Sequence, residues 1–239
     1  MTDPLDNFRR DAKALQKSYD AMDPAARARV EMHLKPDKPL KRADFLHVVA
    51  REKTYVSWPV MKEAVSRLGL DRAGRQQRLK LALWNGQTQV VKSLLFDDPG
   101  ITQDAFALKC AVYEVDGVRD WLAKDPSVVQ QVFGSRGRPI NHLAFSRAFQ
   151  VFPEREADML AVAALLVDAG ANVSDVYEAP EMPQAGTQTP LYGAIAFANN
   201  LVLGQWLLDH GANPTDGEAL YHACELGHVE GIRMLCKAG

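Results

Sequence analysis

The sequence has few cysteines, no strong excess of charge of either sign and no long hydrophobic run. Its 239 residues include three cysteines, Cys110, Cys224 and Cys236, which are odd in number and lack the spacing of a zinc motif. We expect all three to be small, reduced core residues, since free cysteines are usually buried. A formal net charge of −2 gives no electrostatic basis for binding nucleic acid or an anionic membrane.

Membrane, export and catalytic signals are missing as well. No stretch approaches the roughly 18 apolar residues that span a bilayer, and residues 1–6 contain neither the basic nor the apolar region of a signal peptide. We therefore expect a cytoplasmic protein, with a secreted effector as an open alternative. Phosphate-binding, serine-hydrolase, zinc-protease and calcium-loop motifs are absent, and His222, Cys224 and His228 lack zinc spacing. We expect no enzyme activity, no metal and no cofactor.

Helical periodicity is what the sequence does contain. Apolar residues recur three and four apart in residues 5–19, and Asp23 and Pro24 supply the N-cap and first-turn proline of a second helix. Further helices are predicted over residues 43–52 and 58–68. No segment alternates with a period of two, so the sequence predicts an all-α protein with no sheet beyond turn-like hairpins.

Short helical blocks then recur from about residue 75 onward. One block begins Thr189-Pro190-Leu191-Tyr192-Gly193-Ala194 and ends Leu207 to Pro214, and the next runs from Leu220 to Gly239. Weaker copies occupy residues 139–144 with 165–173, 79–95 and 108–122. These blocks resemble the ankyrin repeat, whose first helix opens with T-P-L-H-x-A. Residues 50–59 resemble, more loosely, the leading segment of some bacterial ankyrin-repeat proteins.

The resemblance implies an ankyrin-repeat solenoid of about five helix-turn-helix repeats over residues 73–239, preceded by N-terminal capping helices in residues 1–72. Residues 149–156 lengthen the third repeat between its helices, and residues 174–188 lengthen the loop after it. Matched residues have defined roles: Thr189 caps a helix, Gly170 and Gly211 end helices in the left-handed region, and His142 is structural. Leu207, Leu235, Trp121 and Trp206 are expected in the core.

The resemblance also indicates which residues face the concave groove, because in ankyrin proteins these follow the small residue of each first helix. The predicted protein-binding residues are Trp84, Asn85, Tyr113, Glu114, Phe145, Phe197, Glu225 and Leu226, with Ser146 or Arg147 as alternatives to Phe145. Aromatic residues are frequent in binding hot spots. The alternative is that some of them pack on neighbouring loops.

These observations favour a non-enzymatic protein-protein interaction module that binds its partner through the groove and the fingertip turns. A regulatory subunit that responds to a small ligand is the alternative, although no polar cluster of titratable residues marks such a site. The last block carries Val229, Ile232 and Met234 with no further repeat after them. We therefore expect a partner, a second copy of the chain or further residues to cover this end.

Overall fold

The computed structural model describes residues 5–35, 38–180 and 186–239, and it divides into two compact units, Met1–Asp71 and Arg72–Gly239. The division falls one residue before the boundary expected from the sequence. Most described residues are helical, which confirms the prediction of an all-α protein. One antiparallel pair of two-residue strands, β1 (Tyr177–Glu178) and β2 (Thr187–Gln188), interrupts the helices. No helix in the described ranges is long and apolar enough to cross a bilayer.

The described residues of the first unit form four helices: α1 (Asp6–Asp20), α2 (Pro24–Glu31), α3 (Arg42–Glu52) and α4 (Trp58–Arg67). The Asp23 side chain accepts a hydrogen bond from the backbone N–H of Ala26 at 2.9 Å, so α2 begins where the sequence predicts. The apolar core of the first unit includes Leu15, Val30, Phe45 and Val49. Arg29 donates to both Asp11 (2.8 Å) and Glu52 (2.7 Å), which connects α2 to α1 and α3.

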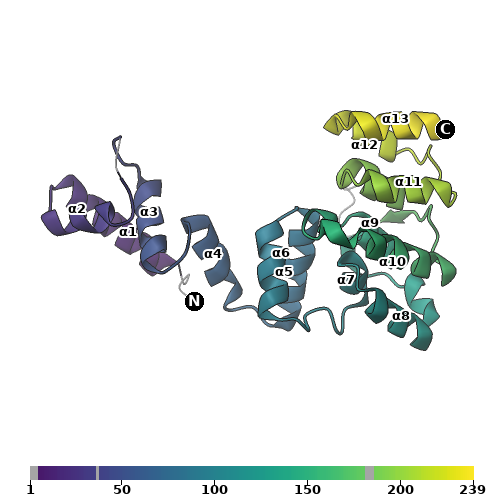
Figure 1. Cartoon of the computed structure of the whole chain (residues 1–239), viewed down its shortest axis with the longest axis horizontal. Helices are drawn as coiled ribbons and strands as arrows, with labels where there is room; N and C mark the ends of the chain where they lie inside the picture. Colours follow the sequence, from purple (N-terminus) through teal and green to yellow (C-terminus); the bar gives the residue numbers. More distant parts are fainter. Residues whose placement is uncertain (1–4, 36–37, 181–185) are drawn as a thin grey trace. The chain divides into compact units, whose positions relative to one another are not determined.

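The second unit is built from helix pairs that follow one another (Figure 1). The pairs are α5 (Arg72–Trp84) with α6 (Thr88–Asp97), α7 (Phe106–Ala111) with α8 (Val115–Lys124), α9 (Pro139–Ala144) with α10 (Glu156–Asp168), the π-helical turn η6 (Tyr192–Phe197) with α11 (Leu201–Asp209), and α12 (Ala219–Leu226) with α13 (Val229–Ala238). Each first helix contacts the first helix of the next pair, and α8, α10, α11 and α13 contact in the same order. The side formed by α5, α7, α9, η6 and α12 is called the first-helix face below.

The turn inside each pair has a recurring geometry. A residue with positive φ ends the first helix in four pairs: Gly86 (63°), Tyr113 (65°), Asn199 (55°) and Gly227 (71°). In three of these pairs the next residue donates to a carbonyl five residues back, with N···O distances of 2.9, 3.0 and 2.9 Å at Gln87, Glu114 and His228. The second helices α10 and α11 end alike, at Gly170 (97°) and Gly211 (89°).

The third pair departs from this pattern where the sequence predicts extra length. Two short 3-10 turns, η3 (Ala148–Gln150) and η4 (Pro153–Arg155), lie between α9 and α10. The backbone N–H of Arg147 donates across the pairs to the carbonyl oxygen of Leu83 at 3.1 Å. The inserted turns therefore cover the ends of neighbouring first helices.

One hydrophobic core runs through all five pairs, and Leu207 and Leu235 are buried in it as predicted. Trp121 and Trp206 are only half-buried at its edge. The prediction that all three cysteines are core residues is wrong: Cys110 is buried, but Cys224 and Cys236 are exposed. Both exposed thiols lie on the last pair, Cys224 on α12 and Cys236 on α13.

Candidate functional site

Three of the predicted groove residues are buried, which fits the alternative that some of them pack on neighbouring loops. Trp84 is 7% exposed, and Tyr113 and Phe145 are fully buried. The extra turns of the third pair explain the burial of Tyr113, since its hydroxyl accepts a hydrogen bond from the backbone N–H of Phe149 at 3.2 Å. These side chains hold the pairs together and do not form the outer surface.

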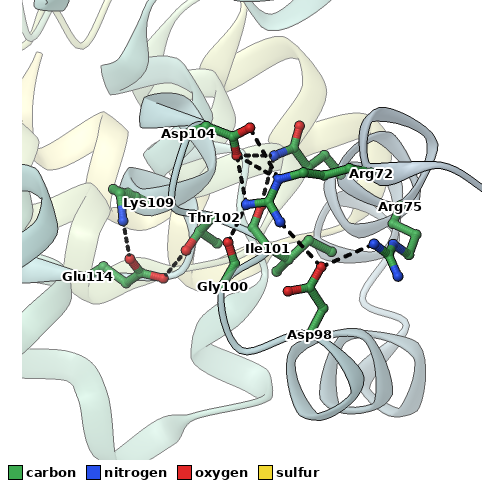
Figure 2. Close-up of polar contacts among 10 residues, drawn as sticks. Arg72, Arg75, Asp98, Gly100, Ile101, Thr102, Asp104, Lys109 and Glu114 are labelled. Atoms are coloured by element: carbon green, nitrogen blue, oxygen red, sulfur yellow. Dashed lines mark hydrogen bonds and ion pairs between the residues drawn. The ribbon is translucent and has the colours of Figure 1, made fainter.

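Glu114 is also held by hydrogen bonds within the second unit. Its carboxylate accepts hydrogen bonds from Lys109 (2.8 Å) and from the hydroxyl of Thr102, as Figure 2 shows. Beside this group, Arg72 binds Asp104 at 2.9 Å and Asp98 at 3.5 Å (Figure 2). The two groups fix the connection between α6 and α7, so Glu114 has a structural role.

The other four predicted groove residues lie at the surface. Asn85 is exposed and donates from its side chain to the carbonyl oxygen of Leu81 at 2.8 Å. Glu225 is exposed, with its carboxylate 2.9 Å from Nδ1 of His222. Leu226 is 53% exposed, and Phe197 is half-buried. These residues are accessible to a partner.

The structure brings three of the predicted aromatic residues around Arg136, a residue that sequence reasoning missed. Arg136 ends the short 3-10 turn η2 (Gly134–Arg136), just before α9. Its guanidinium carbon lies 4.2 Å from the ring centroid of Phe145, 4.6 Å from that of Trp84 and 4.8 Å from that of Phe197. These are cation–π distances. One signal in the sequence could have indicated Arg136. Arginine is enriched in protein interfaces, and Arg136 lies in the loop before α9.

The charge of Arg136 has no acidic partner within the described part of the chain. Its guanidinium donates to the side-chain oxygen of Gln188 at 2.9 Å, and Gln188 in turn donates to the carbonyl oxygen of Ser135 at 2.9 Å. Burial lowers the pKa of Arg136 to about 10, so the group stays protonated at neutral pH. None of its nitrogen atoms is both buried and without a hydrogen-bond partner. Arg136 is half-buried, so it keeps part of its surface accessible to solvent.

Two further cations lie beside the same rings. Lys80 Nζ is 6.0 Å from the centroid of Trp84 and donates to the carbonyl oxygen of Phe133 at 3.3 Å. The guanidinium carbon of Arg147 is 4.9 Å from the centroid of Phe197, and this guanidinium donates to the backbone oxygen of Phe197. Burial lowers the pKa of both cations. We call Lys80, Trp84, Arg136, Phe145, Arg147 and Phe197 the cation–aromatic cluster.

Aromatic contacts continue from this cluster to the last helix pair. The Tyr192 ring lies edge-on to Phe145 at 5.2 Å and stacks on His222 at 4.5 Å. His222 lies between the carboxylates of Glu218 (3.3 Å) and Glu225 (2.9 Å). The first-helix face thus carries contiguous rings from α9 and η6 to α12.

His142 lies beneath the cluster and is fully buried. Its Nε2 is 2.9 Å from the carbonyl oxygen of Phe133, the same oxygen that Lys80 contacts. Burial, followed by the charges of Lys80 and Arg136, lowers the pKa of His142 to about 3. The imidazole is therefore neutral and supports the loop that carries Arg136.

The structure defines an all-helical protein whose second unit is a succession of helix pairs with a cationic and aromatic cluster on one side. Across the described ranges, no three His, Cys, Asp or Glu side chains lie close enough to hold a metal ion. Compared with models of known protein families the chain has no match, and no curated protein is significantly similar to it.

Proposed function

We propose that the second unit is an ankyrin-repeat solenoid of five repeats and that this cytoplasmic protein binds a partner protein without catalysing a reaction. The repeated positive-φ turn supports this assignment, since the same backbone geometry recurs at Gly86, Tyr113 and Gly227. The motif that begins at Thr189 also supports it. The Thr189 hydroxyl accepts from the backbone N–H of Tyr192 at 3.0 Å, as a helix cap does.

The concentration of rings and cations on the first-helix face carries the functional proposal. Aromatic residues and arginine are enriched in protein interfaces and dominate their binding energy. Arg136 is held by three rings, and exposed Asn85 directly follows Trp84 of the same cluster. At the other end, exposed Glu225 contacts His222, which stacks on Tyr192. The buried rings therefore fix the position of Arg136, and Asn85 and Glu225 are accessible residues of the same face.

A small-molecule ligand is less well supported at the cation–aromatic cluster. The hollow beside Lys80 and Phe133 has a volume of about 150 Å³. Sites for small molecules usually have roughly 300–1,000 Å³. A partner protein requires no enclosed cavity, because it binds across a surface.

Affinity purification from the native cells, followed by mass spectrometry, tests the proposal. The tagged wild type is compared with Asn85→Arg and Leu226→Arg on the first-helix face, and with Val202→Arg as a matched control. Val202 is 41% exposed but lies on the second helix α11. We expect a partner that the wild type and Val202→Arg recover and that both face variants lose, with unchanged helicity. Equal recovery by all four proteins would contradict the proposal.

A further inference from the structure

We infer that the cation–aromatic cluster binds an acidic peptide segment of the partner, with an Asp or Glu carboxylate on Arg136 and neighbouring carboxylates on Lys80 and Arg147. This inference rests on the proposed function and specifies the chemistry of the partner. It does not follow from the helix pairing itself, since that pairing is compatible with partners of any charge.

The cluster lacks the carboxylates that accompany other buried and half-buried cations of this unit. Lys109 pairs with Glu114 at 2.8 Å, Arg138 with Asp175 at 2.8 Å, and Arg155 with Asp158 at 2.9 Å. Lys80, Arg136 and Arg147 form no ion pair with the described residues, although each is half-buried. Partly desolvated charge is unfavourable unless it is paired. An acidic ligand would supply the missing charge.

The Arg136 guanidinium is also held in one orientation. Three rings surround its guanidinium, and Gln188 takes one N–H group, so the position of the guanidinium is fixed before a ligand arrives. The N–H groups that Gln188 does not take can bind a carboxylate in the plane of the guanidinium. Since the side chain is already ordered, little conformational entropy is lost when the ligand binds.

Arg136 shares one aromatic ring with each of the other two cations of the cluster. Lys80 lies at the Trp84 ring, Arg147 lies at the Phe197 ring, and Arg136 contacts both rings. The shared rings therefore link the cations in a series, in the order Lys80, Arg136 and Arg147. A series suits an extended segment with several single charges, whereas phosphate recognition gathers several donors around one group. These positions favour Asp and Glu side chains over a phosphorylated residue.

Fluorescence anisotropy of labelled peptides on the full chain tests this inference. The probes are hexaglutamate, hexaglutamine and a glycine-spaced triphosphoserine peptide. We expect saturable binding of hexaglutamate that weakens as NaCl is added, and no binding of hexaglutamine. Arg136→Met should weaken the hexaglutamate complex at least about tenfold, since it removes a charge-assisted bidentate contact. Lys80→Met and Arg147→Met should each weaken it by a smaller factor.

The matched control is Arg233→Met on α13, because Arg233 is exposed and already paired with Glu230. It should bind hexaglutamate like the wild type. Circular dichroism verifies the fold of each variant, and if Arg136→Met does not fold, Lys80→Met and Arg147→Met decide the outcome. Equal affinity of the folded cluster variants and Arg233→Met would overturn the inference. Binding of the phosphopeptide without hexaglutamate binding would overturn it in favour of a phosphorylated partner.

The partner recovered by affinity purification separates this inference from the proposed function. A partner that Leu226→Arg loses but Arg136→Met retains would leave the protein-binding function intact and overturn the acidic chemistry. Loss of that partner in both variants, together with hexaglutamate binding, is the result that we expect.

Discussion

Replacing Thr189 by valine should weaken the connection between the fourth and fifth helix pairs. The Thr189 hydroxyl accepts from the backbone N–H of Tyr192 at 3.0 Å and donates to the Asp216 carboxylate. The other oxygen of Asp216 accepts from the backbone N–H groups of Glu218 (3.0 Å) and Ala219 (2.8 Å) at the start of α12. One buried hydroxyl thus joins two helix starts, and valine keeps its shape without its hydrogen bonds.

The expected decrease in the free energy of unfolding follows from these contacts. Loss of a helix cap costs roughly 0.5–2 kcal/mol, and loss of a hydrogen bond to a charged group costs about 1.5–3 kcal/mol. The two contacts share one hydroxyl, so their contributions overlap. We expect Thr189→Val to lower the free energy of unfolding by about 2–4 kcal/mol, and Thr189→Ser to lower it less because serine keeps the hydroxyl.

Urea unfolding followed by circular dichroism measures this change as a shift in the midpoint at constant slope. Thr187→Val is the matched control, since among the described residues the Thr187 hydroxyl hydrogen-bonds only to the exposed Glu178 carboxylate, at 3.3 Å. It should change the free energy by less than about 0.5 kcal/mol. If Thr189→Val and Thr187→Val had the same midpoint, the assigned role of the Thr189 motif would be refuted.

Three further predictions follow from burial. Leu207→Ala and Leu235→Ala should each lower the free energy of unfolding by roughly 2–5 kcal/mol, because both side chains are buried; an unchanged thermal melt would contradict this. NMR should show the His142 imidazole neutral at pH 5, since its pKa is lowered to about 3. In the unfolded chain the pKa of His142 is near 6.5, so its contribution to the free energy of unfolding is full above that pH and decreases as the pH falls toward 3. Protonation of His142 in the folded protein at pH 6 would refute this prediction. A thiol reagent should modify exposed Cys224 and Cys236 in the folded protein but Cys110 only after unfolding, because Cys110 is buried and burial raises its pKa; equal rates would contradict this.

Local chemistry explains which parts of the fold could be predicted from the sequence. Asp23 with Pro24, and Thr189 with Pro190, specify helix starts through contacts within three residues. The glycines that end α10 and α11 are equally local, because only their own backbone requires the left-handed region. These elements were predicted at or near their observed positions.

The candidate site depends on contacts between distant segments, which the sequence pattern does not contain. The burial of Tyr113 depends on where the turns after Ala148 lie, and the position of Arg136 depends on Gln188, 52 residues later. A repeat motif predicts which residues follow each first helix, but it does not predict which loop covers them. For this reason the repeat pattern indicates the positions of Trp84 and Phe145 but leaves open whether they are buried.

Photocrosslinking in the native cells tests most directly whether the first-helix face binds a protein. A photoreactive amino acid is placed at Asn85 or Leu226 on this face, or at Val202 on α11, all three being accessible positions. We predict that the same partner is crosslinked from Asn85 and Leu226 and not from Val202. Crosslinking of that partner from Val202 alone, or of no protein from either face position, would contradict the account.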